Sequence, residues 1–353
     1  MGTVSPVAGG HTIEGEDVVW LRVGAALEAV ARREAARLAH RVGLPAQRVA
    51  EVELAVTEAA TNLQRHARDG SLALRVVTLP DRAAVELLSL DSGPGIPDLS
   101  RVLADGVSSR GTLGVGLGAI ARCADTFDMH SLPGRGTVLL ARFWSGRAED
   151  ADGAAEPAVA GLTRPISGET VCGDSWAART EAGPDGPVVT TMMCDGLGHG
   201  PLAALASERA RAAFRTHVQR SPLDIMRALH EELKGTRGAA VTVARADFAR
   251  GTVESCGVGN VSGCVVSGGK RSALLSLPGI VGHHRQPSRS FQTPLGPDGV
   301  LVLHTDGLSD RWSPHDFPGL FGRRPATIAA QILGQAGIRR DDAGIVVVRP
   351  AAP

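Results

Sequence analysis

The chain has 353 residues, which is enough for two ordinary domains that each bury a core of their own. Lysine plus arginine and aspartate plus glutamate both number 37, so the formal net charge is zero and gives no reason to expect nucleic acid or an anionic membrane as a partner. No run of eighteen apolar residues occurs, and residues 1–10 lack the basic start and apolar stretch of a signal peptide. We therefore expect a cytoplasmic protein.

Hydrophobic periodicity in the first half of the chain predicts helices followed by a sheet. The expected elements are a strand at 18–23, helices at 25–42 and 45–66, strands at 72–79 and 83–90, a helix at 115–124 and further strands that end at Trp144. Pro45 suits the first turn of its helix because its backbone angle is fixed near the helical value. This order predicts an α+β domain with an antiparallel or mixed sheet, and not a doubly wound fold.

The composition changes most sharply between Ser145 and Thr163, where Gly, Ala, Glu, Asp and Pro dominate without hydrophobic periodicity. We expect domains at 1–145 and 164–353, joined by a linker at 146–163. The second domain is expected to contain strands near Val171 and at 187–194, helices at 201–217 and 222–233, short strands between 239 and 302, a helix at 326–336 and a strand at 344–349. Many strands with two long helices predict a β-sandwich flanked by helices.

Residues 58–118 carry the chemistry of a nucleotide site. Glu58 and Asn62 lie four residues apart and so share one helical face, where an amide and a carboxylate suit Mg²⁺ among phosphates. Asp91 ends a strand and is followed by glycines that let the backbone turn tightly beside a ligand. The glycine-rich stretch 111–118 leads into a helix whose first N–H groups are a natural phosphate cradle. Each of these motifs alone is weak evidence for a nucleotide site, and the prediction rests on their order and spacing.

The order Glu58-x-x-x-Asn62, Asp91-x-Gly93-x-Gly95 and Gly114-x-Gly116-x-Gly118 resembles the ATP-binding fold shared by histidine kinases, gyrase and Hsp90, over about residues 15–145. The short lid and the stretch 57–62 look most like the anti-sigma-factor serine kinases. The resemblance implies that Glu58 is the general base for a serine or threonine hydroxyl. It also implies the ATP contacts: Asn62 for Mg²⁺, Asp91 for adenine, and Gly93, Gly95, Gly114, Gly116 and Gly118 for close backbone approach.

In the second half, aspartates stand beside glycine or another aspartate near the ends of apolar strands. They are Asp174, Asp195, Asp306 and the pair Asp341-Asp342. Hard Mg²⁺ or Mn²⁺ prefers oxygen ligands, so the set is a plausible two-metal cluster. A single Asp-Gly is more often only a turn, and it is the four sites in order that favour a metal centre.

These motifs, with Gly257-Val-Gly259-Asn260 between them, resemble metal-dependent serine/threonine phosphatases of the 2C type, in their bacterial sporulation and stress-response branch, over about residues 160–349. The resemblance implies that Asp195 bridges two Mn²⁺ or Mg²⁺ ions, with the Gly196 carbonyl on one and Asp306 and Asp341 on the other. Asp174 would complete the cluster directly or through water. Asp195 and Asp306 are thereby the catalytic residues of this half, and a water between the cations would attack the phosphoserine or phosphothreonine phosphorus.

Two departures from the larger relatives stand out in this half. Ala177 replaces a second aspartate in the first motif, and Gly344 stands where a threonine is common after the paired aspartates. Compact stress phosphatases share the Gly-Asp-Ser form of the first motif, so we interpret the differences as a subfamily feature. A pseudophosphatase scaffold remains an alternative.

Together the two resemblances imply a bifunctional regulator that carries a serine/threonine kinase and the opposing phosphatase. The implied partner is an anti-sigma-antagonist protein of the sulfate-transporter-like class, in a partner-switching or stressosome pathway. Kinases that resemble the first half often form dimers, so we expect a homodimer, although the sequence itself does not indicate a dimer interface. The alternative is a phosphatase whose N-terminal half binds ATP only to dock a partner or gate the phosphatase, with no phosphoryl transfer of its own.

Overall fold

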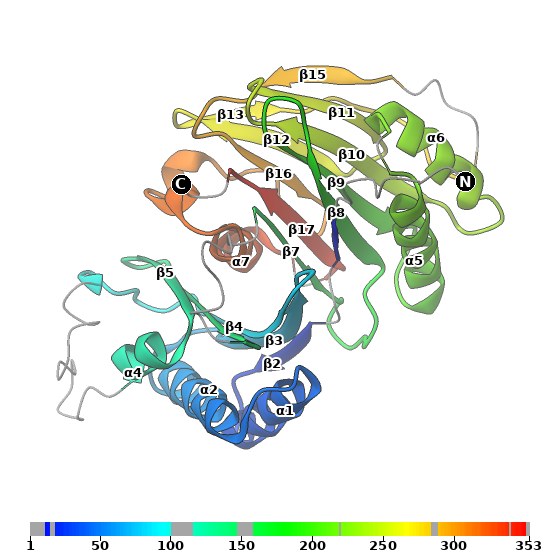
Figure 1. The fold of residues 1–353 in the computed structure, drawn as a ribbon. Coiled ribbons are helices and arrows are strands. Elements are labelled where there is room, and N and C mark those ends of the chain that lie inside the picture. Colours follow the sequence, from blue (N-terminus) through cyan, green and yellow to red (C-terminus); the bar gives the residue numbers. More distant parts are fainter. Residues whose placement is uncertain are drawn as a thin grey trace, which may run out of the picture. The chain divides into compact units, whose positions relative to one another are not determined.

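The structure is a computed structural model that describes residues 11–14, 18–99, 116–146, 158–218, 220–283, 289–338 and 340–350 (Figure 1). The chain forms two compact units, and neither is continuous in sequence. We call them by their sheets. The one-sheet unit comprises the described parts of Glu16–Ala155 and Phe317–Gln335, and the two-sheet unit those of Met1–Gly15, Glu156–Asp316 and Ala336–Pro353.

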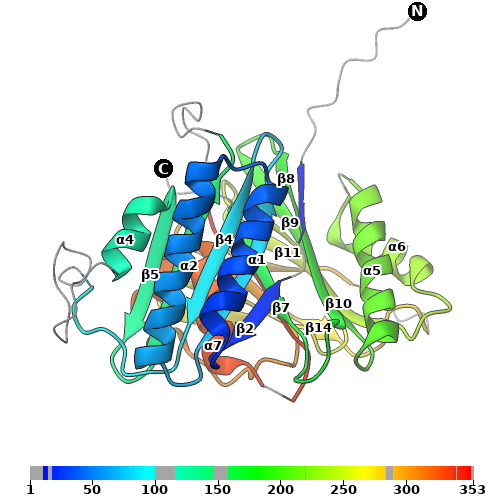
Figure 2. The ribbon, with the colours of Figure 1, turned by 90° about the horizontal axis from the view of Figure 1, so that it is seen from below.

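The one-sheet unit is an antiparallel sheet with two long helices packed on one face (Figure 2). Its strands run in the order β2-β3-β4-β6-β5. The elements are β2 (Val19–Arg22), α1 (Leu27–Arg41), α2 (Ala46–His66), β3 (Ser71–Thr78), β4 (Ala83–Leu90), α4 (Gly116–Cys123), β5 (Thr126–Leu132), β6 (Gly136–Trp144), a 3₁₀ turn at Leu320–Gly322 and α7 (Pro325–Ala336).

The core of this unit explains why the helices form where they do. Buried residues recur at helical spacing along α2, including Val52, Val56 and Leu63, and they pack with alternate residues of the strands such as Leu74 and Leu87. A stripe at this spacing places one helical face on the sheet and leaves the other for solvent. The α+β class expected for this half is confirmed.

The two-sheet unit is a β-sandwich. Its larger sheet runs β1-β8-β9-β10-β11-β14, with β15 also on β11, and its smaller sheet runs β13-β12-β16-β17-β7. The strands are β1 (His11–Glu14), β7 (Val159–Arg164), β8 (Asp174–Ala182), β9 (Pro187–Gly196), β10 (Ala239–Asp247), β11 (Thr252–Val258), β12 (Ser262–Ser267), β13 (Lys270–Ala273), β14 (Ser276–Leu277), β15 (Phe291–Pro294), β16 (Val300–His304) and β17 (Ala343–Val348).

Glycines and helices determine how the sandwich packs. A Cβ at Gly161 of β7 would lie 2.5 Å from the Trp176 ring of β8, so the missing side chain lets the two sheets approach. Helices α5 (Pro201–Thr216) and α6 (Pro222–Glu232) pack on the larger sheet through buried residues such as Phe214, Ile225 and Leu229. The sandwich flanked by helices that the sequence predicts is confirmed.

Several boundaries differ from the expected ones. Pro45 precedes α2 in an extended conformation, with φ −67° and ψ 158°, and so caps the helix instead of entering its first turn. Val171 lies outside any strand, since β8 starts at Asp174. β7 begins at Val159, inside the range expected as linker, because residues 159–164 pair with β17 and complete the smaller sheet.

Two segments also lie on the other side of the expected domain division at 146–163. β1 pairs with β8 in the two-sheet unit, although it comes from the range 1–145. Conversely, α7 belongs to the one-sheet unit, although it comes from the range 164–353. Neither exchange follows from local composition, because each depends on contacts far away in sequence. Among the described residues, no helix has the length and apolarity needed to cross a membrane.

Candidate functional site

The predicted kinase residues Glu58 and Asn62 both lie on α2 and are half-buried there. The start of α4 faces them: a Cβ at Gly116 would lie 3.4 Å from Glu58 Oε2 and 3.5 Å from Asn62 Nδ2. Asn62 Nδ2 is itself buried and has no hydrogen-bond partner among the described residues. A buried amide that the fold does not use is costly, so it fits a position that a bound ligand completes.

The Asp91 loop supplies the second part of this site. Asp91 follows β4, its N–H donates to the Thr137 carbonyl at 3.0 Å, and its Oδ1 accepts the Gly93 N–H at 2.6 Å. Burial raises the pKa of the Asp91 carboxyl, while hydrogen bonds to that carboxyl from the backbone N–H groups of Gly93 and Thr137 lower it. Gly95 has φ 71°, and any Cβ there would overlap the Leu132 carbonyl, so glycine is required at that point of the loop.

Gly136 is a functional candidate that the sequence reasoning missed. It begins β6 with φ 88°, and a Cβ there would overlap the backbone carbonyl of Asp91. The Asp91 turn therefore depends on a glycine from a different strand. Of the remaining predicted glycines, Gly118 is buried in α4, whereas Gly114 lies outside the described residues.

The predicted metal residues gather at one end of the sandwich. Asp174 at the start of β8 and Asp195 near the end of β9 are direct partners across the antiparallel pair. Asp306 follows β16 and Asp341 precedes β17. Burial, followed by the charges of Asp306, Asp341 and Asp342, raises the pKa of Asp195 to about 7. Such an effect requires that these carboxylates lie close to one another.

Asp174 is buried, with 5% of its surface exposed. Burial and the charge of Asp195 raise the pKa of its carboxyl well above the usual value, and a hydrogen bond from Thr305 opposes that rise. Thr305 Oγ1 donates to Asp174 Oδ2 at 2.7 Å and accepts the Gly344 N–H at 2.8 Å. A Cβ at Gly344 would lie 3.3 Å from Asp174 Oδ2 and would overlap the Met193 side chain. The glycine at this departure from the family pattern therefore leaves room for the Met193 side chain beside Asp174.

The other aspartates divide into structural and exposed ones. Asp342 is buried and accepts the backbone N–H groups of Ile166 at 2.7 Å and Gly173 at 2.8 Å, so its oxygens hold two loops together. Asp341 is exposed. Asp306 is exposed as well, and its Oδ2 accepts a 2.7 Å hydrogen bond from Asn260 Nδ2. Asp341 and Asp306 therefore keep oxygens that are accessible to a ligand.

Within the described parts of the chain, no three His, Cys, Asp or Glu side chains stand close enough together to form a ready-made metal site. The carboxylates form an open cluster in which burial and the neighbouring aspartate charges raise the pKa of Asp174, Asp195 and Asp306. All the donors of the predicted set are oxygens, including the Gly196 carbonyl. Gly196 itself lies beside Ala203 of α5. A hard divalent cation fits this donor set, because it would both bind the oxygens and relieve their repulsion.

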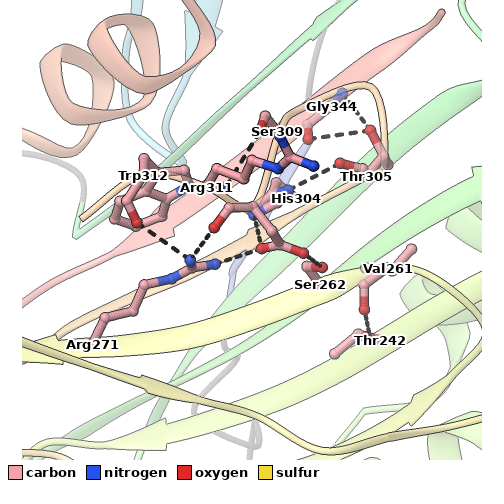
Figure 3. A network of polar contacts seen from close by, with 11 residues as sticks. Thr242, Val261, Ser262, Arg271, His304, Thr305, Ser309, Arg311, Trp312 and Gly344 are labelled. Carbon is pink, nitrogen blue, oxygen red and sulfur yellow. Dashed lines mark hydrogen bonds and ion pairs between the residues drawn. The ribbon is translucent and has the colours of Figure 1, made fainter. Parts of the chain in front are cut away.

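Behind Thr305 lies a polar network that the sequence reasoning also missed (Figure 3). His304 is buried, with Nδ1 2.9 Å from the Thr305 carbonyl and Nε2 3.2 Å from Asp310 Oδ1. Asp310 also accepts from Ser262 at 2.6 Å and from Arg271 at 2.5 Å. His304 first, and then Ser262 and Arg271, hold the pKa of Asp310 below its ordinary value. The network fixes the end of β16, from which Thr305 and Asp306 project.

Thr305, Asn260 and Asp342 stood inside motifs that the sequence analysis singled out, but their contacts were not foreseen. Motif spacing indicates which residues meet at a site. It does not say which of two adjacent aspartates turns inward to bind backbone N–H groups. Only the structure answers that question: Asp342 is buried, whereas Asp341 is exposed.

Comparisons with known proteins agree with the two halves. Residues 23–143 match the family model of the histidine kinase-like ATPase domain, and residues 185–349 match that of stage II sporulation protein E (SpoIIE). The serine/threonine-protein kinase RsbT of Bacillus subtilis is 32% identical over 125 residues, which are 35% of this chain and 94% of RsbT.

Two further relatives cover one half each. The phosphoserine phosphatase RsbX of Bacillus subtilis is 24% identical over 143 residues, 40% of this chain and 70% of RsbX. The anti-sigma F factor of Caldanaerobacter subterraneus subsp. tengcongensis is 27% identical over 126 residues, 34% of this chain and 87% of that protein. The chain therefore belongs, in its N-terminal half, to the RsbT-type serine/threonine kinases of the histidine kinase-like ATPase family, fused to a metal-dependent protein phosphatase domain of the SpoIIE family.

Proposed function

We propose that the chain is a bifunctional regulator that phosphorylates a serine or threonine of a small protein partner and removes such a phosphate again. The observation that carries the proposal is the pairing of Asp174 with Asp195 across β8 and β9, within reach of the charges of Asp306 and Asp341. The second support is the position of Glu58 and Asn62 opposite Gly116. We assign the kinase reaction to the domain at 1–145 and the phosphatase reaction to that at 164–353.

In the phosphatase reaction, Asp195, the Gly196 carbonyl, Asp306 and Asp341 would hold two Mn²⁺ or Mg²⁺ ions, with Asp174 joining directly or through water. When bound, such ions supply an acidified water and neutralise the charge of a phosphate ester. Asn260 orients Asp306 through its 2.7 Å hydrogen bond, and Thr305 orients Asp174. These contacts fix the orientation of the two carboxylates. Residues that support a metal site typically orient its ligands in this way.

In the kinase reaction, Glu58 would accept the proton of the substrate hydroxyl, Asn62 would hold the Mg²⁺ of ATP, and Asp91 would accept the adenine amino group. Phosphoryl transfer depends mainly on positioning and charge stabilisation, so a single carboxylate at hydrogen-bond reach is enough as a base. Asp91 suits its part because Gly93 and Thr137 already fix its loop. The helix start at Gly116 would place N–H groups near the phosphates.

The partner we propose is an anti-sigma-antagonist protein of the sulfate-transporter-like class, in a partner-switching or stressosome pathway. The similarity to RsbT, RsbX and an anti-sigma F factor supports this class of partner. Joining both activities in one chain raises the effective concentration of each at a partner that the other has bound.

The phosphatase half is tested by hydrolysis of a generic phosphate ester with and without Mn²⁺. We expect metal-dependent turnover that Asp195→Asn and Asp306→Asn each abolish. Asp185→Asn, an exposed carboxylate elsewhere in the same unit, is the matched control and should retain full activity. Absence of turnover with any divalent cation would contradict the phosphatase assignment.

The kinase half is tested separately with ATP and a candidate partner protein. Glu58→Gln should abolish phosphorylation and leave ATP affinity intact, whereas Glu53→Gln on the same helix should change neither. If ATP binds but no partner is phosphorylated by the unsubstituted chain, the N-terminal half is a docking or gating module for the phosphatase.

A further inference from the structure

An arginine lies at the end of the larger sheet that carries the predicted metal ligands. In the pair of β9 and β10, Ala239 lies opposite Gly196 and Ala240 lies opposite Asp195. Arg237 comes two residues before Ala239, on the loop that leads into β10. Because neighbouring strands lie only about 4.8 Å apart, this loop lies beside the loop that follows Asp195 and Gly196.

The guanidinium of Arg237 lies against the loop that follows β9. Its Nη1 atom is 3.0 Å from the position that a Cβ on Gly198 would occupy. The Gly198 carbonyl oxygen in turn lies 3.4 Å from the corresponding Cβ position of Gly173, the residue before Asp174. Gly198 therefore contacts both the arginine and the start of β8, which places the positive charge of Arg237 at the edge of the predicted metal site.

The backbone on both sides of this arginine is fixed by hydrogen bonds. The Arg237 carbonyl accepts from His283 Nε2 at 2.7 Å. The Gly238 carbonyl accepts the Leu197 N–H at 3.1 Å, and the Gly238 N–H donates to Thr236 Oγ1 at 2.9 Å. The Arg237 side chain therefore projects from a rigid part of the loop, and the bond to Leu197 joins that loop to the one that follows β9.

The fold itself does not use the guanidinium of Arg237. The side chain is exposed, and within the described parts of the chain its guanidinium has neither a hydrogen bond nor an ion pair. Glu169, whose carboxylate lies beside Gly200 of the same loop, pairs with His199 at 3.4 Å instead. An arginine without a structural partner is ordinarily only a solvated surface charge. Arg237 differs from such a residue because its backbone is fixed and because it lies beside carboxylates that are predicted to bind cations.

We propose that Arg237 is a substrate-binding residue that holds the phosphate group of the phosphoserine or phosphothreonine at the edge of the metal site. The proposal rests on the phosphatase function proposed above. A guanidinium is always charged, and its planar fork of N–H donors matches two oxygens of a phosphate. The carboxylates of the site repel a phosphate dianion, and a fixed cation at the edge of the site offsets part of that repulsion.

The test uses the full chain and makes two measurements on each variant. Calorimetric titration of inorganic phosphate into the Mg²⁺-loaded protein measures phosphate binding, and hydrolysis of a generic phosphate ester gives kcat and KM. Arg237→Ala should bind inorganic phosphate roughly tenfold more weakly and raise KM by a similar factor, because charge-assisted hydrogen bonds are lost. The value of kcat should change little, since the contact forms equally with the bound ester and with the transition state. Arg237→Lys, which keeps the charge without the fork, should give intermediate values.

Two controls separate a phosphate contact from a general change of charge or from damage to the metal site. Arg220→Ala is the matched variant, because Arg220 is an exposed arginine of the same unit that follows the C-terminal end of α5. It should leave phosphate binding and KM unchanged. Calorimetric titration with Mg²⁺ should give the same metal affinity for Arg237→Ala as for the unsubstituted chain, since no metal ligand is altered.

Unchanged phosphate affinity in Arg237→Ala, an equal loss in Arg220→Ala, or a loss of Mg²⁺ affinity as large as that of phosphate would overturn the proposal, even where the unsubstituted chain hydrolyses the ester. A chain that hydrolyses no ester but binds inorganic phosphate through Arg237 would contradict the proposed function alone. An unsubstituted chain that binds neither Mg²⁺ nor phosphate would contradict both.

Discussion

Thr305 donates a 2.7 Å hydrogen bond to the buried carboxylate of Asp174, and the Gly344 N–H in turn donates to the same threonine hydroxyl. The hydroxyl thereby joins the loop after β16, the start of β8 and the start of β17. Hydrogen bonds to a charged group contribute about 1.5–3 kcal/mol, more than bonds between neutral groups. Thr305 thus belongs to the supporting structure of the metal site although it bears no charge.

We predict that Thr305→Val weakens Mn²⁺ binding roughly 10- to 100-fold, because the Asp174 carboxylate loses the hydrogen bond that opposes its raised pKa. Thr305→Ser retains the hydroxyl and should bind Mn²⁺ nearly as the unsubstituted chain does. Calorimetric titration of the three proteins at pH 7.5 is the measurement. Equal affinities in all three would show that the hydroxyl does not support Asp174.

The raised pKa of Asp195 predicts that the metal-free protein loses stability as the pH rises from about 4 to about 7. The unfolded chain gives up this proton near the ordinary aspartate pKa, whereas the folded chain keeps it until about pH 7. The folded state therefore binds more protons in this window, and rising pH favours unfolding. Thermal unfolding in a chelator at pH 5, 6, 7 and 8 should show a falling melting temperature.

Asp195→Asn is the matched variant for this pH effect, because it removes the titrating group and keeps its shape. Its melting temperature in chelator should exceed that of the unsubstituted chain at pH 8 and approach it at pH 5. Mn²⁺ should stabilise the unsubstituted chain most at high pH, since binding needs the deprotonated carboxylates. A melting temperature that rises from pH 5 to pH 8 in chelator would contradict the prediction.

At Gly344, we predict that even alanine is destabilising. Its Cβ would overlap the end of the Met193 side chain and lie 3.2 Å from Asp174 Cβ. Overpacking of this kind typically costs about 1–3 kcal/mol. Denaturant unfolding should show that loss in Gly344→Ala, and Met193→Val, which shortens the colliding side chain, should recover part of it in the double variant. Additive losses from the two substitutions would mean that they do not share this space.

For the ATP site, we predict that Asn62→Leu stabilises the fold while it abolishes Mg²⁺-ATP binding. The Asn62 Nδ2 atom is buried without a partner among the described residues, and removing such a group relieves roughly 1–3 kcal/mol. Melting temperature and binding of a fluorescent ATP analogue are measured on the same samples. Lower stability in Asn62→Leu would show that the amide is used by the fold itself.

The sequence predicted the elements well where a periodic pattern is local. The helix expected at 45–66 appears as α2, and the strand expected at 83–90 appears as β4, because buried residues recur along each at the spacing of its own secondary structure. Asp174 at the start of β8 and Asp195 near the end of β9 lie opposite each other in the sheet, whereas their role as metal ligands stays a prediction.

What sequence reasoning missed depends on contacts between distant segments. α7 is buried from Pro325 to Leu333, including its polar residues Thr327 and Gln331, so its sequence does not mark one face for solvent and does not say which sheet it packs on. Asp128 and His130 are polar positions of a strand that no sequence motif singles out, and only the structure shows their buried contacts with α7. Polar residues at alternate positions of one strand, together with Thr327 and Gln331 four residues apart on an otherwise apolar helix, are the signal that could have suggested it.

β1 and α7 each belong to the unit that is formed mainly by the other half of the chain. This arrangement affects the order in which the chain folds as it leaves the ribosome. When residue 155 has been made, the one-sheet unit still lacks α7, which is synthesised about 170 residues later. At the synthesis rates of living cells, about 5–20 residues per second, that interval lasts roughly 10–30 seconds. The face of β5 that carries Asp128 and His130 is without its helix throughout that time, so a gene cut at the linker would give a fragment in which this face never gains it.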